Sequence, residues 1–170
     1  ELLRACIRKG TLAGTFVPVV AGSAFRNRGI GTLLDAIVSY LPAPGEVALE
    51  GGLHCAADEP FAALAFKIVS GDHGDLTLLR VYRGQLEAGG TVLNANIGRR
   101  ERVARVYEMH ADKREERARM QAGDIVAVAG LKHTLTGHTL TDPEHALLLE
   151  QISVPEPVLD VSITPRTQAD

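Results

Sequence analysis

From residue 60 to about residue 154, apolar residues recur at alternate positions in a series of short runs, with no helical pattern between them. Such alternation is typical of strands with one buried face. Strands that follow one another without helices must stack or close on themselves to hide their edges. The sequence therefore predicts a small antiparallel β-barrel. The runs expected to form its strands are residues 63–68, 76–81, 91–96, 102–109, 124–129 and 146–154.

The first 44 residues follow a different pattern, which predicts mixed α/β structure. Residues 2–7 are spaced like the buried face of a helix that we expect to end at Gly10. The wholly apolar run 16–20 predicts a strand buried on both faces. Residues 30–41 have the apolar spacing of an amphipathic helix, and a proline follows them. Residues 45–58, which contain several glycines, predict a linker.

Composition limits both the core and the kind of partner. Tryptophan is absent and aromatic residues make up 4% of the chain, so Val, Leu, Ile and Ala must fill the core and few rings can stack on bases. A 45% hydrophobic and 23% charged composition excludes a disordered chain. Cys6 and Cys55 make no disulfide framework, and the six histidines include no pair with metal-ligand spacing. We therefore expect free thiols, no metal site and a cytoplasmic location.

The sequence has none of the common catalytic loops: G-x-x-x-x-G-K-[ST], G-x-G-x-x-G and G-x-S-x-G are all missing. Gly22, Ser23 and Ala24 follow the strand expected at 16–20, and small residues there let backbone N–H groups approach a ligand. On these residues alone, an ordinary strand-to-loop turn is the favoured interpretation. His133 and His138 flank an expected hairpin turn, where an acid–base role would need a carboxylate that the sequence cannot place. We predict no catalytic residue.

Basic residues are concentrated in one segment. Residues 99–119 contain eight of the eighteen basic residues and five acidic ones, a net charge of +3 in a chain of net charge −3. A basic surface on an acidic protein suits the binding of RNA phosphates. The interleaved acids also fit a solvated surface with salt bridges. The candidate RNA-binding residues are Arg99, Arg100, Lys113 and Arg114.

Three groups of short sequence motifs follow one another along the chain in the order found in a known family. They are Phe16-Val17-Pro18-Val19 with Gly22-Ser23-Ala24-Phe25-Arg26-Asn27-Arg28-Gly29, Met109-His110-Ala111-Asp112-Lys113-Arg114-Glu115-Glu116 with Ala122-Gly123-Asp124-Ile125, and Pro155-Glu156-Pro157-Val158 with Thr164-Pro165-Arg166-Thr167. These groups resemble the end of the GTP-binding domain, the β-barrel second domain and the entry to the third domain of bacterial translation elongation factor G, a translational GTPase. The resemblance implies a mainly β chain: a translation-factor β-barrel preceded by an α/β remnant of a P-loop GTPase domain. The segments that it implies are residues 1–44, 45–58, 59–155 and 156–170.

The resemblance also implies a function. The family's factor is a ribosome-dependent GTPase that drives translocation of transfer and messenger RNA and takes part in ribosome recycling. Ser23 and Ala24 would present backbone amides to the guanine of GTP, which the intact parent binds with magnesium. The phosphate loop and the magnesium ligands are expected before Glu1, so this chain alone should neither bind GTP tightly nor hydrolyse it. The implied partners are small-subunit ribosomal RNA and the remaining domains of the parent factor.

Several alternatives stay open at this point. His133 and His138 stand where the family commonly has acidic residues, and Gly71-Asp72-His73 replaces a more usual Asp-Pro step. The parent is either the principal translocase or a duplicated elongation factor G with a recycling or accessory role. A stand-alone adaptor that binds a protein through the helix at 30–41 is a further alternative. Because both ends look severed, the N-terminal helix and the run 158–163 are expected to self-associate or to be mobile.

Overall fold

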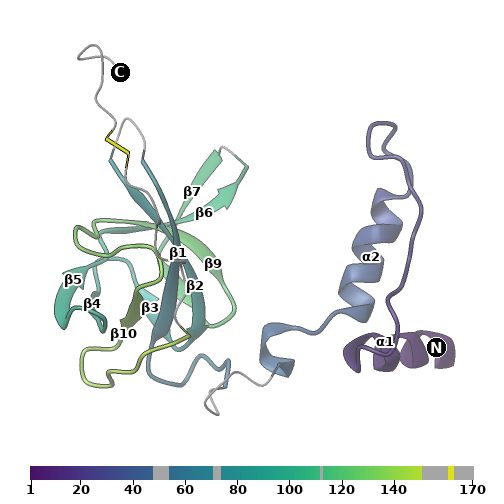
Figure 1. Cartoon of the computed structure of the whole chain (residues 1–170), viewed down its shortest axis with the longest axis horizontal. Helices are drawn as coiled ribbons and strands as arrows, with labels where there is room; N and C mark the ends of the chain where they lie inside the picture. Colours follow the sequence, from purple (N-terminus) through teal and green to yellow (C-terminus); the bar gives the residue numbers. More distant parts are fainter. Residues whose placement is uncertain (48–53, 71–73, 112, 151–160, 163–170) are drawn as a thin grey trace.

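The computed structural model consists of an N-terminal helical segment and a β-barrel, which stand apart in Figure 1. A connection that includes the short helix η1 (Pro44–Glu46) joins them. Within the described part of the chain, no helix has both the length and the hydropathy that a membrane span requires. The structure describes residues 1–47, 54–70, 74–111, 113–150 and 161–162.

The described residues form ten strands, all paired antiparallel, as the alternating pattern predicted. Eight of them follow the hydrogen-bonding order β5-β4-β10-β1-β2-β9-β6-β7, and β3 pairs with β8 as a separate ribbon. The sheet curls around a single interior (Figure 1). The strands are β1 (Ala62–Val69), β2 (Leu76–Arg83), β3 (Gln85–Glu87), β4 (Thr91–Asn94), β5 (Arg99–Arg102), β6 (Arg105–His110), β7 (Lys113–Arg117), β8 (Arg119–Gln121), β9 (Ile125–Ala129) and β10 (Thr139–Thr141).

Small and branched side chains fill the barrel interior. Ala63 and Ala65 of β1 meet Leu79 and Val81 of β2 in one buried cluster. Met120 of β8 belongs to the same cluster and has no exposed surface. Because alanine carries only a methyl group, the strands can close tightly around the larger Leu and Met side chains. The expected Val, Leu and Ala side chains are found there, but Phe61 is also a buried member of this cluster, so one aromatic ring belongs to the core.

Strand β1 is buried on both faces over its first half, so the alternation expected for it is incomplete. Ala62 and Leu64 lie on its outer face, where Leu149 covers them. The Leu149 N–H donates a hydrogen bond to the Thr139 hydroxyl (3.2 Å), which fixes this cover over the sheet. Residues 146–150 are therefore a covering segment, and the strand expected there is wrong for the described residues. The remainder of that run, 151–154, lies outside them.

Two further expectations for the barrel are wrong. The run 102–109 divides into β5 and β6, because Val103 and Ala104 turn a corner between them. The Val103 N–H bonds to the Gly90 carbonyl (3.0 Å) and the Ala104 N–H to the Ala129 carbonyl (2.8 Å), so two different neighbours hold the corner. The strands β3, β7, β8 and β10 were not expected, because three of them have only three residues and β7 consists entirely of charged residues. Such strands show no apolar alternation.

The N-terminal segment differs from the α/β structure expected for it. Helix α1 (Leu2–Leu12) continues through Gly10, where an end was expected. The ring of Phe16 packs against Gly10 and would have to move if a Cβ were added there. Helix α2 (Ile30–Tyr40) is confirmed. The run 16–20 forms no strand among the described residues, and Val17 and Val19 are 82% and 91% exposed. A strand needs a hydrogen-bonded neighbour, which that run does not have among the described residues.

Arg8 joins the two helices to the connection. Its guanidinium donates to the carbonyls of Ser39 (3.1 Å) and Leu41 (2.9 Å) at the end of α2, and to both carboxylate oxygens of Glu46 (2.9 and 2.7 Å). The Ala43 N–H also bonds to Glu46 (2.6 Å). The hydrogen bond from Ala43, followed by that from Arg8, holds the pKa of Glu46 below its ordinary value. One arginine thus satisfies carbonyls that end α2 and fixes η1 against α1.

The central packing of the barrel can be tested with one buried and one exposed residue. Leu79 is fully buried and pairs with Ala65 on one side and Val126 on the other. We expect Leu79→Ala to lower the free energy of unfolding by about 2–5 kcal/mol, because it leaves a cavity between tightly packed strands. Ile125→Ala, at a residue that is 62% exposed in β9, should change it by less than about 0.5 kcal/mol. Urea denaturation measures both, and equal effects would contradict this account of the core.

Candidate nucleic-acid interface

Strand β5 presents three exposed arginines around one buried acid. Arg99, Arg100 and Arg102 are exposed, whereas Glu101 between them is 7% exposed. The strand pairs only with β4 among the described strands, so it lies at one end of the sheet order. Figure 1 shows β4 and β5 at the opposite side of the barrel from the helical segment. The basic part of this strand is therefore open to a partner.

Glu101 connects β5 to the loop formed by residues 131–134. Its Oε2 accepts the backbone N–H groups of Lys132 (2.6 Å) and His133 (2.9 Å), and its Oε1 accepts the hydroxyl of Thr134 (2.6 Å). The Thr134 hydroxyl oxygen in turn accepts a hydrogen bond from the Asn94 amide (3.1 Å). Both carboxylate oxygens of Glu101 therefore accept hydrogen bonds from the loop, and these bonds set the position of the Lys132 backbone relative to the arginines of β5.

These hydrogen bonds also set the charge state of Glu101. Burial alone would raise the pKa of its carboxyl group, because it disfavours the charged form. The donors from Thr134, His133 and Lys132 act in the opposite direction and prevail, so the pKa of Glu101 lies below its ordinary value of 4.5. The carboxylate is consequently ionised at neutral pH and strengthens each of the hydrogen bonds that it accepts.

An open pocket of about 250 Å³, which we call the β5 pocket, lies over this junction. Its walls come from β5 and from the loop that Glu101 holds. Four of its side chains are basic, and they come from two segments some 30 residues apart in the chain. The sequence pattern identified Arg99 and Arg100 but missed Lys132, because only the contact through Glu101 brings it near. The lining residues are Arg99, Arg100, Glu101, Arg102, Gly130, Lys132 and His133.

His133 and His138 both make hydrogen bonds that hold the segment between β9 and β10 in place. The Nδ1 atom of His138 accepts the Leu135 N–H (3.1 Å) and lies 3.0 Å from the Asn94 amide nitrogen. His138 also accepts the Ala65 N–H of β1 through its backbone carbonyl (2.9 Å), which joins the loop to the barrel. The Glu101 carboxylate accepts a hydrogen bond from the backbone N–H of His133. Among the residues that the structure describes, no carboxylate pairs with the ring of His133 or His138, so an acid–base role for them has no support there.

The other two candidate RNA-binding residues, Lys113 and Arg114, lie on a different ribbon. They are exposed on β7, which pairs with β6 at the far end of the sheet order from β5. Figure 1 shows the β6–β7 ribbon projecting away from β4 and β5. The structure therefore divides the four predicted residues into two pairs on separate surfaces.

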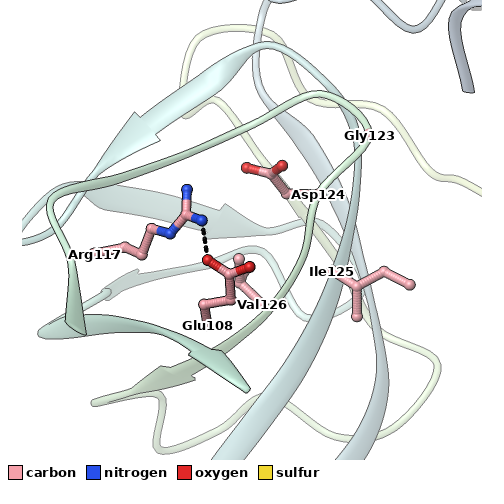
Figure 2. Close-up of a pocket in the computed structure, with 6 residues that line it drawn as sticks. All are labelled: Glu108, Arg117, Gly123, Asp124, Ile125 and Val126. Carbon is pink, nitrogen blue, oxygen red and sulfur yellow. Dashed lines mark hydrogen bonds and ion pairs between the residues drawn. The ribbon is translucent and has the colours of Figure 1, made fainter. Parts of the chain in front are cut away.

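Acidic side chains balance the charge around the β6–β7 ribbon. Figure 2 shows Arg117 paired with Glu108 beside the carboxylate of Asp124, in a pocket of about 300 Å³. The ring of His110 lies 3.7 Å from a Glu108 oxygen and 3.8 Å from a Glu115 oxygen. In sequence, residues 105–117 contain four basic and four acidic residues, so the ribbon has no net charge. It is a poorer surface for phosphate than the β5 pocket.

The Gly22–Ala24 loop belongs to the helical segment. The Ser23 N–H bonds to the Arg28 carbonyl (2.9 Å) and the Arg28 N–H returns a bond to Ser23 (3.0 Å). A Cβ at Gly22 would lie 2.8 Å from the Arg28 carbonyl, so this close pairing requires glycine. The Ser23 amide is therefore already occupied within the loop. The Ala24 N–H has no backbone acceptor among the described residues. Of the Ser23 and Ala24 amides, it is therefore the one that a ligand could reach.

Comparison with known proteins first defines the class of the barrel. Residues 74–141 match the family model described as elongation factor Tu domain 2. A crystal structure of a protein from Thermus thermophilus superposes with a TM-score of 0.73 at 25% identity, over 99% of this chain and 24% of that one. The expected fold class, an antiparallel β-barrel of the translation-factor type, is confirmed.

Two curated relatives then show which kind of translation factor the chain resembles. Elongation factor G 2 of Hahella chejuensis is 51% identical over 99% of this chain, and elongation factor G of Gluconobacter oxydans is 45% identical over 98% of it. The chain spans 26% of the length of each relative. This chain is thus homologous to elongation factor G over almost its whole length, which confirms the resemblance found in its sequence.

The role of Glu101 can be tested by removing its carboxylate. Glu101→Ala leaves the Thr134 hydroxyl and two backbone N–H groups without their acceptor, so we expect a loss of about 3 kcal/mol in the free energy of unfolding. Glu87→Ala, at an exposed acid of β3, should cost less than about 0.5 kcal/mol. Denaturation at neutral pH measures both, and a cost for Glu101→Ala no larger than that for Glu87→Ala would contradict the assigned role.

The same residue gives the barrel a pH dependence of known sign. Since the pKa of Glu101 is lowered on folding from its ordinary value of 4.5, the ionised group stabilises the folded chain above that pH. The contribution is lost as the pH falls through the folded-state pKa. The difference in unfolding free energy between the wild type and Glu101→Ala should therefore shrink below pH 4.5. A difference that grows on acidification would contradict the sign.

Proposed function

We propose that this chain works as part of a GTPase that moves transfer RNA and messenger RNA on the ribosome, as the elongation factor G resemblance implies. The observation that carries the proposal is 45–51% identity to proteins of that name over 98–99% of the chain. The barrel would dock the factor on ribosomal RNA of the small subunit. The cytoplasm is the proposed place of action, because ribosomes work there.

We propose a smaller part for the helical segment. Gly22, Ser23 and Ala24 would complete the guanine site of the intact factor, whose GTP and magnesium are held mainly by other residues. The accessible Ala24 amide supports a contact from that residue, whereas the Ser23 amide would have to leave the Arg28 carbonyl first. The proposed segments are those of the sequence analysis, with residues 1–44 in the GTP-binding domain, 45–58 as linker, 59–155 as barrel and 156–170 at the start of a third domain.

A segment exchange tests the proposed activity. The matching segment of Gluconobacter oxydans elongation factor G is replaced by this chain, and a second chimera carrying the Hahella chejuensis segment serves as the control. We expect both chimeras to hydrolyse GTP in response to ribosomes and to move transfer RNA. A folded chimera that binds GTP but does not respond to ribosomes would contradict the proposal. If the chimera carrying this chain hydrolyses GTP with ribosomes and splits their subunits but does not move transfer RNA, the result would favour a recycling role for the parent protein.

A nucleotide-binding measurement on the chain alone gives a second test. The 170 residues contain no G-x-x-x-x-G-K-[ST] loop, and phosphoryl transfer needs that loop together with magnesium ligands and a positioned water. We expect no saturable binding of a fluorescent GTP analogue at micromolar concentration, and no hydrolysis with ribosomes present. Turnover by the chain alone would contradict the proposed division of labour.

A further inference from the structure

We propose that the β5 pocket is the surface of this chain that binds RNA phosphates, with Arg100 of β5 and Lys132 of the loop after β9 as its main cations. The inference rests on the proposed docking to ribosomal RNA and goes beyond it by choosing one of the two basic surfaces. It also assigns a role to Lys132, which no sequence pattern identified. The β6–β7 ribbon, with Lys113 and Arg114, is correspondingly excluded as the main phosphate contact.

The distribution of charge carries the choice between the two surfaces. Residues 105–117 have equal numbers of basic and acidic residues, so the net charge of +3 in the segment 99–119 comes from β5 and Arg119 alone. Lys132 adds another positive charge at the β5 pocket. On the β6–β7 ribbon, Arg117 is already paired with Glu108 (Figure 2). A phosphate approaching β7 would meet carboxylates, whereas one approaching β5 meets mostly cations.

The hydrogen bonds of Glu101 explain why its negative charge does not cancel this field. Glu101 is 7% exposed, and its carboxylate accepts hydrogen bonds from three donors of the protein. Its role is to hold the Lys132 backbone next to β5, so that cations on both walls are positioned before a ligand arrives. Arg102 is restrained too, because its Nε donates to the Gly89 carbonyl (3.0 Å). Positioned cations lose less side-chain entropy on binding.

The chemistry of the pocket favours nucleic-acid phosphate over bases. Among the described residues, the only ring in its lining is the His133 imidazole, and the chain as a whole has no tryptophan. Recognition of unpaired bases ordinarily uses stacking on aromatic rings. Arginine and lysine side chains from two adjacent segments suit instead the phosphates of a folded RNA backbone. We therefore expect RNA binding that depends strongly on the salt concentration and only weakly on the RNA sequence.

Two double variants with the same change in charge test the assignment. Arg100→Ala/Lys132→Ala removes one Arg and one Lys from the β5 pocket, and Lys113→Ala/Arg114→Ala removes the same pair from β7. Binding of the full chain to small ribosomal subunits is measured over a salt series. Removing a cation that touches a phosphate should weaken binding about tenfold at ~0.1 M salt and lower the salt slope by about 1. The β5 variant should therefore bind about 100-fold more weakly, whereas the β7 variant stays within about threefold of the wild type.

A second measurement tests RNA binding at the β5 pocket independently of binding to the ribosomal subunit. Amide NMR spectra of the chain are recorded with a short A-form RNA duplex, and we expect shifts confined to residues 99–102 and 130–134. Unchanged binding by the β5 variant, or a larger loss for the β7 variant, would overturn the inference while leaving ribosome docking intact. Shifts in the pocket without binding to subunits would support the pocket and contradict the docking. Subunit binding that depends on β5, without any shift by RNA, would indicate a ribosomal protein as the partner and overturn the RNA assignment.

Discussion

The barrel depends on the close packing of β1 against its neighbours. Ala63 and Ala65 face the interior, where their small volume leaves room for Leu79 and Met120, and Ala62 and Leu64 are covered on the outside. A strand buried on both faces cannot shift its register without exposing apolar surface, so β1 fixes β2 on one side and β10 on the other. The loop that follows β9 is attached to the same strand through the Ala65 backbone, and the β5 pocket is built on that loop.

The architecture could be predicted where the signal is local. The spacing in α2 and the alternation in β2 and β9 depend on the segment itself, and the structure confirms them. The run 16–20 was misjudged because an apolar run forms a strand only when a neighbour supplies hydrogen bonds. Strand β7 was missed because its five residues are charged, so only pairing with β6 defines it.

The candidate interface, like the fold, could be predicted only in part from local sequence signals. Clustered arginines in the sequence pointed to β5, but charge counted along the chain could not separate β5 from β7. That separation needs the pairing of Arg117 with Glu108 and the long-range contact of Glu101 with Lys132, which spans 31 residues. The Arg117–Glu108 pair lies within the β6–β7 hairpin, whereas the contact of Glu101 with Lys132 joins separate parts of the sheet. One local pairing and one long-range contact thus distinguish the two parts of the basic segment.

A cryo-electron microscopy structure of the chain bound to the small ribosomal subunit tests the central claim most directly. The account predicts that the β5 pocket faces ribosomal RNA, with Arg100 and Lys132 within hydrogen-bond distance of phosphate oxygens, and that the β6–β7 ribbon makes no comparable contact. Contacts to RNA through Lys113 and Arg114, with the β5 pocket facing solvent, would contradict it.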